Sequence, residues 1–498
     1  MYFFSRWGGG YLLFKSDWKN TFLIVISTVA IIIVFISQLY FINPYTASWD
    51  QVDFALAVKR YDLMAMQPHF PGYPFFILGG KFIHLFVMDP SKALTIFNVF
   101  CYASSIFPIY KLSRRFIKRS FASLSTALIY SASYSVIMVN QPMSEGAALA
   151  AFWWYLWSLL FAFNKNNVRI LIPLGFLSLM LGIRLSYMPF AIGIIFLFHW
   201  KLKRDFLKMK EIIYYLILGV IFQAIWVIGL VISEGSIIGF IKLSLAFTSG
   251  HFNDWGGTVE AADIGFVDRF LIFSLKNILW TGIATESVLS AVIYIFFLIY
   301  IFYNAFKKVK KRWPFMNLLY LLFSSYFGWA LLAQNVEKAR HVLPLSTLLI
   351  FFLCILLFSE RIPFLIMGLS IFVLCHQVNQ NVTLLKAEAK EPPAVYQMNT
   401  YIEKMNEPVI LYTWEETRVL QYLDVPYTHK RIETYQYFRY DAKYFQGRTV
   451  LLTDKVIQGF RSQGISIDGK IKKIATFHSN ELFEPVYHEI ILYKWVAK

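Results

Sequence analysis

Long apolar runs alternate with short polar segments along this chain of 498 residues. The first run, 21–42, contains no charged residue, and as a helix rising ~1.5 Å per residue it is long enough to cross a hydrocarbon core of ~30 Å. It is too long for a removed signal peptide and lacks a small-residue cleavage site. Eleven runs are predicted to be membrane-spanning helices: 21–42, 93–110, 121–139, 146–163, 170–183, 186–200, 212–232, 279–306, 315–332, 343–359 and 363–377. The short fifth and sixth runs can also be one broken pair around Arg184.

Composition agrees with this pattern, because 57% of the residues are hydrophobic and only 15% are charged, whereas about a quarter are charged in soluble domains. Cys101, Cys354 and Cys375 all fall within predicted spans, so no disulfide framework is expected. The chain is predicted to be a polytopic α-helical membrane protein.

The net charge of +17 is concentrated on one side of the predicted membrane. With the N-terminus inside, the cytoplasmic segments are 1–20, 111–120, 164–169, 201–211, 307–314 and 360–362. They hold 21 basic and four acidic residues, which accounts for the whole excess. The positive-inside rule explains this distribution, so nucleic acid is not a predicted partner.

The first external loop is predicted over 43–92. Its segment 72–88 is long enough to suggest a further span, but counting it would invert every later basic loop. It is therefore predicted to be an interfacial or re-entrant helix.

Polar segments gather on the predicted outer face. They are 48–88, 140–145, Arg184, 233–277, 334–341 and the tail from about Val378. Charged side chains beside a bilayer are costly unless they pair or face a wet cavity. A functional site is therefore predicted on this face.

The tail has a different pattern, which divides the chain into a transmembrane domain, 1–380, and an extracytoplasmic domain, 381–498. After Pro392-Pro393, strand-like runs cover 408–413, 449–454, 473–478 and 488–496, and helical patterns cover 395–405, 415–422 and 455–463. This alternation predicts a small α/β domain of ~100 residues. It has no phosphate-binding glycine loop and no Cys/His metal spacing, which favours a packing or acceptor-docking module over a second catalytic domain.

Three acids are candidates for chemistry. Asp50 and Asp53, at i and i+3, share one face of a predicted helix, and Glu145 begins the fourth span after the polar turn NQPMS. Each acid could simply stabilise a helix N-terminus. Two on one face beside a membrane cavity favour a catalytic role for at least one.

Several other outer residues are candidates for binding. His69 lies in QPHFPGYP (67–74), where prolines exclude regular helix and hold side chains in place, although a solvated loop is the simpler reading. Arg184, Arg340 and His341 lie at the outer ends of predicted spans. Arginines at such positions either extend to the lipid headgroups or bind a phosphate. His251, Asp254 and Trp255, in HFNDWGG, could form a sugar platform.

These motifs together resemble the C-type membrane glycosyltransferases, a superfamily that includes protein O-mannosyltransferases and the enzyme transferring aminoarabinose to lipid A. Asp50-Gln-Val-Asp53 stands where a subgroup has D-S-G-E, and His69-Phe-Pro-Gly-Tyr-Pro74 stands where it has H-P-P-G-Y-P. Glu145 matches a further acid, and Arg340-His-Val-Leu-Pro344 resembles an R-x-L-x-P span opening. The resemblance covers roughly residues 20–360. The middle residues of the first motif differ, and Asp53 replaces Glu.

The resemblance implies a glycosyltransferase that takes its sugar from a polyprenyl-phosphate donor on the outer face and inverts the anomeric carbon. Asp50 is then expected to be the base that takes the acceptor proton. Asp53 and Glu145 would orient the acceptor or hold Mg²⁺ or Mn²⁺. Arg184 and Arg340 would stabilise the leaving phosphate, while His69 and Tyr73 would shape the donor pocket.

Two other classes of protein stay open at this point. A transporter or flippase of a lipid-linked saccharide would favour charged or broken helices near the midplane and an inverted repeat. A non-enzymatic assembly or sensor protein would tolerate loss of the acids. A bacterial plasma membrane is the expected location, and the sequence identifies neither the sugar nor the envelope acceptor.

Overall fold

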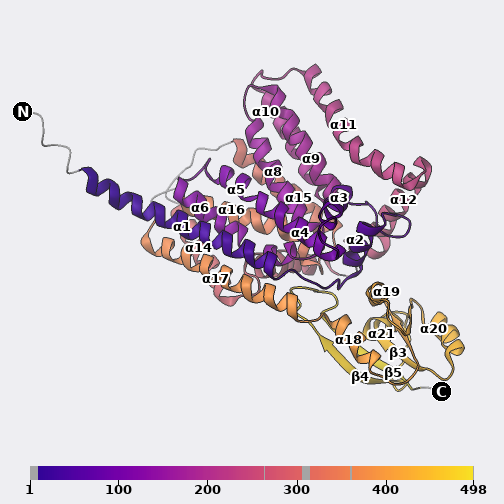
Figure 1. Cartoon of the computed structure of the whole chain (residues 1–498). Helices are drawn as coiled ribbons and strands as arrows, with labels where there is room; N and C mark the ends of the chain where they lie inside the picture. Colours follow the sequence, from indigo (N-terminus) through magenta and orange to yellow (C-terminus); the bar gives the residue numbers. More distant parts are fainter. Residues whose placement is uncertain (1–8, 263, 306–313, 359–361, 497–498) are drawn as a thin grey trace, which may run out of the picture.

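The computed structural model describes residues 9–262, 264–305, 314–358 and 362–496 (Figure 1). The first eight residues and nearly all of the predicted loops 307–314 and 360–362 lie outside the described residues. Helices dominate the first 400 positions, and a small sheet follows them (Figure 1).

Each of the eleven predicted spans corresponds to helix. The elements of this part are α1 (Gly9–Tyr40), α4 (Pro90–Ser104), α5 (Ile106–Ser113), α6 (Arg119–Tyr130), α7 (Ser133–Val139), α8 (Glu145–Ala162), η1 (Asn167–Ile170), α9 (Leu171–Ile183), η2 (Leu185–Ala191), α10 (Ile192–Leu202), α11 (Met209–Glu234), α12 (Ile237–Gly250), η3 (His251–Trp255), α13 (Phe266–Leu271), η4 (Ile272–Ile283), α14 (Val288–Ala305), α15 (Pro314–Ala333), η5 (Ala339–Val342), α16 (Leu343–Phe358) and α17 (Phe364–Lys390). Among the described residues, seven helices are long and apolar enough to cross a membrane, or up to nine if each bent pair counts as one span.

The breaks between these helices differ from the prediction in two places. The expected span 121–139 is divided between α6 and α7, which meet at an angle of 57°. The expected span 279–306 is also divided, because η4 ends at Ile283 and meets α14 at an angle of 108°. Thr285 and Glu286, both with positive φ, make the turn between them. The expected external segment 233–277 is also largely helical. By contrast, the break at Arg184, between α9 and η2, lies where the sequence suggested one.

The first outer loop carries two short helices, α2 (Trp49–Lys59) and α3 (Pro74–His84). Helix α3 covers the segment predicted to be interfacial or re-entrant, and its 11 residues are too few to cross a membrane. Pro74 begins α3, where a missing N–H costs nothing. The chain therefore enters α4 from the same side at which α1 ends.

A buried asparagine fixes the turn that leads into α8. Asn98 of α4 donates hydrogen bonds to the carbonyls of Gln141 (2.9 Å) and Met143 (2.7 Å), and its oxygen accepts from the amide of Ala147 (3.0 Å). This arrangement satisfies backbone groups that would otherwise be unpaired in the buried turn. It also fixes the start of α8, and therefore the position of Glu145.

The tail forms a five-stranded sheet with the order β2-β1-β3-β5-β4, in which β1 runs parallel to β2 and β3, and β5 antiparallel to β3 and β4. Its elements are α18 (Ala394–Glu403), β1 (Val409–Thr413), α19 (Glu416–Tyr422), β2 (Thr428–Arg431), α20 (Tyr435–Asp441), η6 (Ala442–Phe445), β3 (Thr449–Thr453), α21 (Asp454–Ser462), β4 (Ile471–His478) and β5 (Glu489–Trp495). The four predicted strands and three predicted helices are confirmed. Strand β2 and helix α20 were not predicted, because the sequence THKR of β2 has no apolar alternation.

Helix α2 joins the tail to the membrane domain. Apolar residues of α18 and α19 pack on one face of the sheet, those of α20 and α21 on the other, and Val52 of α2 belongs to the first of these clusters. Helix α17 continues to Lys390 and leads directly into the tail (Figure 1). The first outer loop is therefore held between the membrane helices and the tail.

Candidate active site

Four charged residues from four separate elements meet at one end of the membrane helices. Asp50 forms an ion pair with Arg340. The Oε1 atom of Glu145 lies 3.1 Å from Arg184 Nη1 and 3.1 Å from Arg340 Nε. We call Asp50, Glu145, Arg184 and Arg340 the ion-pair cluster. All four were predicted candidates, and the structure brings them together.

The ion-pair cluster contains buried polar atoms without hydrogen bonds. Within the described residues, neither carboxylate oxygen of Glu145 has a hydrogen-bond partner, nor does Arg340 Nε, and all three atoms are buried. Glu145 Oε1 and Arg340 Nε lie 3.1 Å apart as an ion pair without hydrogen-bond geometry. Most buried polar groups in proteins are hydrogen-bonded, so these three atoms mark a place where a polar ligand would be stabilised.

Arg184 is held by its neighbours on both sides. It donates to Ser144 Oγ (2.9 Å), and its Nη2 lies 3.3 Å from His341 Nδ1. The carbonyl of His341 accepts a hydrogen bond from the Tyr326 hydroxyl (3.1 Å). His341, a predicted binding residue, therefore orients Arg184.

Asp50 is charged over the whole physiological range of pH. Burial alone would raise the pKa of its carboxyl, but the charges of Arg340 and Lys338 outweigh burial and hold the pKa well below the ordinary value. In this arrangement Asp50 is a counter-ion of Arg340.

Asp53 has different partners from Asp50. Its Oδ2 lies 3.1 Å from His69 Nδ1, and His69 Nε2 lies 3.0 Å from the Tyr73 hydroxyl. The side chain of Asp53 has no solvent exposure, and burial raises its pKa even though His69 and Arg418 oppose that change. The predicted residues Asp53, His69 and Tyr73 thus form a linear chain of polar contacts.

The tail contributes residues that the sequence analysis did not select. Arg418 of α19 pairs with Asp53 at 2.8 Å. Gln51 donates to Glu484 Oε1 (2.9 Å) and to Gln141 Oε1 (3.3 Å), while Gln141 donates to Glu388 Oε1 (3.0 Å). No local motif marks these residues, because their partners lie up to 433 positions away in sequence.

Among the described residues, His251, Asp254 and Trp255 make no ion pair with the ion-pair cluster. His251 Nε2 lies 2.9 Å from the carbonyl of Ala333, and Asp254 and Trp255 are exposed. Phe247 connects this segment with the first loop, because its ring lies 4.7 Å from that of Trp255 and 6.2 Å from that of His69. A direct sugar platform at Trp255 stays a prediction.

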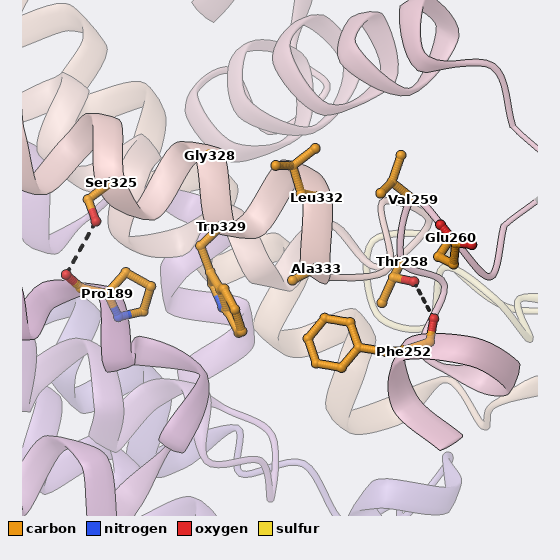
Figure 2. Close-up of a pocket in the computed structure, with 10 residues that line it drawn as sticks. All are labelled: Pro189, Phe252, Thr258, Val259, Glu260, Ser325, Gly328, Trp329, Leu332 and Ala333. Carbon is orange, nitrogen blue, oxygen red and sulfur yellow. Dashed lines mark hydrogen bonds between the residues drawn. The ribbon is translucent and has the colours of Figure 1, made fainter. Parts of the chain in front are cut away.

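An apolar cavity of about 510 Å³ lies next to this segment (Figure 2). Phe252 and Trp329 reach toward it from η3 and α15 (Figure 2). The other lining residues are Pro189, Thr258, Val259, Glu260, Ser325, Gly328, Leu332 and Ala333. Its volume lies within the usual range for a ligand-binding pocket.

The predicted acids do not form a ready metal site. Asp50, Asp53 and Glu145 each pair with an arginine, and the described residues contain no group of three or more His, Cys, Asp or Glu that could hold a metal ion. A divalent cation stays a prediction that metal titration would test.

No protein-family model and no curated protein sequence matches the chain. Among solved structures, ArnT from Cupriavidus metallidurans in the apo state superimposes with a TM-score of 0.55 at 11% identity, over 95% of this chain and 98% of ArnT. The structure of the same ArnT bound to undecaprenyl phosphate gives a TM-score of 0.53 at 11% identity, over 96% and 99%. The chain has a C-type glycosyltransferase fold. The fold that the resemblance implied is therefore confirmed over nearly the whole length.

An oligosaccharyltransferase from Archaeoglobus fulgidus is also similar, with a TM-score of 0.47 at 10% identity, over 88% of this chain and 70% of that protein.

Proposed function

We propose that this chain is a glycosyltransferase that moves a sugar from a polyprenyl-phosphate donor to an acceptor on the outer face of a membrane, with inversion of the anomeric carbon. The observation that carries the proposal is the convergence of Arg184 and Arg340 on Glu145, with three buried polar atoms that lack hydrogen bonds. The fold shared with ArnT, which binds undecaprenyl phosphate, supports the same donor class.

The two arginines suit a leaving phosphate. A phosphate departs with its negative charge already present, so cationic groups stabilise it better than an acid does. Guanidinium groups match phosphate oxygens in a paired geometry. Since Glu145 and Asp50 already balance both arginines, a bound phosphate would compete with these carboxylates for the guanidinium groups.

This competition gives Asp50 a role that depends on the donor. While Arg340 holds it, Asp50 is a poor proton acceptor, because its pKa lies far below neutral. When the donor phosphate engages Arg340, Asp50 loses its main partner and its pKa rises toward the ordinary value. The carboxylate could then take the proton from the attacking acceptor, so that base strength appears only when the donor is in place.

The apolar cavity suits the lipid part of the donor. Phe252, Val259 and Leu332 give it an apolar lining (Figure 2), and each buried CH₂ of a lipid contributes about 0.8 kcal/mol. Ala333 borders the cavity and leads into the turn that carries Arg340. A lipid in this cavity would therefore lie beside the start of the turn that leads to Arg340.

The charge asymmetry of the sequence supports an orientation with the N-terminus in the cytoplasm and the tail outside, and the family resemblance favours a bacterial plasma membrane as the location. Labelling of single introduced cysteines in intact cells would test this orientation. We expect a membrane-impermeant reagent to modify a cysteine at the exposed tail residue Asp468 and to leave one at Lys203 unmodified.

Transfer assays in membranes test the function. Wild-type membranes supplied with polyprenyl-phosphate sugars are expected to consume one donor and to label an acceptor. Asp50→Asn should lose this transfer, whereas Asp468→Asn, at an exposed acid of the tail, should retain it. If the wild type consumes no donor but carries lipid-linked sugar across the membrane, the chain is a flippase and the proposal is wrong.

A further inference from the structure

One arginine of the tail, Arg418, contacts both α2 and the loop that follows it. Arg418 Nε donates to Asp53 Oδ1 (2.9 Å), and its Nη2 donates to the carbonyls of Ala65 (3.3 Å) and Met66 (3.1 Å). Its side chain is 14% exposed and that of Asp53 is 0% exposed. This guanidinium therefore balances a fully buried carboxylate and also fixes the backbone of the loop that carries His69.

From Asp53, polar contacts lead through His69 to Tyr73. Asp53 Oδ2 contacts His69 Nδ1, and His69 Nε2 contacts the Tyr73 hydroxyl. The His69 ring lies 5.4 Å from the ring of Phe54 and stacks on Phe247 at 6.2 Å. The imidazole therefore has packing partners on separate elements, and Asp53 sets which nitrogen carries the proton.

The proton positions follow from the donor and acceptor chemistry of each group. A carboxylate only accepts, so His69 Nδ1 carries a hydrogen and donates it to Asp53. If the imidazole is neutral, Nε2 accepts the hydroxyl hydrogen of Tyr73. If it is protonated, Nε2 donates instead, and the Tyr73 hydrogen is released for another acceptor.

Tyr73 packs against α2, the helix that carries Asp50, with its ring 4.7 Å from that of Phe54. Burial raises the pKa of its hydroxyl, and the charges of Arg184, Asp50, Glu145 and Arg340 also act on it. Its backbone is left-handed, with φ of 47°, a strained conformation for a residue with a side chain and one that recurs at functional sites. A released Tyr73 hydrogen would therefore be available to an anion held by the arginines.

We propose that Arg418 of the C-terminal domain is a positioning residue of this site, which acts through Asp53 and His69 to direct the Tyr73 hydroxyl toward the phosphate of a bound donor. This inference rests on the proposed function and extends it, because it makes the tail an integral part of the donor site. Arg418 itself does not contact the donor in this proposal. Its role is to keep the Asp53 carboxylate in the orientation that fixes His69.

Arg431 provides a matched control on the same domain. It stacks on Trp414 (4.4 Å) and on Trp49 of α2 (5.6 Å), and it pairs with Glu433 (3.3 Å). Arg431 thus joins the tail to α2 as Arg418 does, and among the described residues its ion pair is with Glu433 and not with Asp53. A variant at Arg431 removes a docking contact and leaves the chain from Asp53 to Tyr73 in place.

The experiment uses the full-length protein in lipid nanodiscs and undecaprenyl phosphate as the probe. The affinity for this lipid is measured for the wild type, Arg418→Met, Arg418→Lys, Arg431→Met, Asp53→Asn and the double variant with Arg418→Met and Asp53→Asn. Limited proteolysis of the tail is recorded for each variant.

Arg418→Met should weaken binding about tenfold or more, as expected when a buried charge pair loses one partner. Arg418→Lys should recover part of the loss, and Arg431→Met should bind within about twofold of the wild type.

The double variant separates positioning from docking. If Arg418 acts through Asp53, adding Arg418→Met to Asp53→Asn should weaken binding no further, because contacting residues of one network are not additive. Additive losses would overturn the role of Arg418 as a positioning residue, and so would equal binding by the wild type and Arg418→Met. Neither result would affect the proposed function. If the wild type does not bind undecaprenyl phosphate, the proposed function falls and this inference falls with it.

Discussion

Arg340 and Asp50 form an ion pair although 290 positions separate them in sequence. The pair joins η5, which leads into α16, to the first turn of α2 in the first outer loop. Because Arg340 also contacts Glu145, this guanidinium connects the first outer loop with the outer end of α8. Any anion that binds Arg340 therefore alters the surroundings of both carboxylates.

The first prediction concerns the proton acceptor. Asp50→Asn should lower the rate of transfer about 10²–10⁴-fold, the usual contribution of a general base, while donor affinity stays equal or rises because Arg340 loses a competing carboxylate. Steady-state rates and donor binding measured on the same preparations would check both parts. A variant that transfers at the wild-type rate would remove Asp50 from the mechanism.

The second prediction concerns the arginines. Arg184→Lys and Arg340→Lys keep a positive charge but lose the planar fork, so undecaprenyl phosphate should bind about tenfold more weakly. Arg461→Lys is the control, since Arg461 pairs with Asp468 on the exposed surface of the tail. Equal affinity of all three variants would show that paired hydrogen bonds from Arg184 and Arg340 do not hold the phosphate.

Local pattern was enough to predict the helices and most of the candidate residues. The apolar runs, the break at Arg184 and four strands of the tail were all predictable, because burial and membrane insertion leave a periodic or continuous apolar signal. Glu145, Arg184 and Arg340 were recognised because charges at span ends are unusual, and Asp50 because it shares a helix face with Asp53. Their pairing was not predictable, since four separate elements supply them.

The tail residues at the site could not be predicted in this way. Arg418 and Glu484 lie in a nearly neutral domain among many other charged residues, and nothing in their local sequence distinguishes them. Their importance comes from contacts with Asp53 and Gln51 across more than 360 positions. Such contacts depend on how the tail packs against α2, and a single sequence carries no local signal for that packing.

The third prediction concerns pH and the docking of the tail. Burial raises the pKa of Glu484 from 4.5 to about 7, with Asp50 and Glu415 adding to the shift and Arg340 and Lys338 opposing it. An acid with a raised pKa binds its proton more tightly in the folded state, so its stabilising effect is complete below about pH 4.5 and is lost as pH rises through 7. Glu484→Gln should remove this loss, which is on the order of 3 kcal/mol.

Proteolysis of the tail between pH 5 and 8 would measure this effect. The difference between the wild type and Glu484→Gln isolates Glu484 from Glu416, whose pKa burial also raises to about 7. The wild type should become more sensitive to protease than the variant as pH rises. If both show the same pH dependence, Glu484 does not control docking.

The fourth prediction concerns the apolar cavity and the lipid. A side chain can be added at Gly328, which lines the cavity, because no atom lies within 4 Å of the position of an added Cβ. Gly328→Leu should therefore fold normally and occupy space that the isoprenoid chain would use. Since a displaced lipid loses about 0.8 kcal/mol for each CH₂ that it no longer buries, affinity for undecaprenyl phosphate should fall about tenfold or more.

Gly368→Leu on α17 is the matched control, because its added Cβ also meets no atom within 4 Å and Gly368 does not line this cavity. Undiminished binding by Gly328→Leu would place the lipid elsewhere on the protein, whereas equal losses in both variants would indicate a general effect of the added leucine.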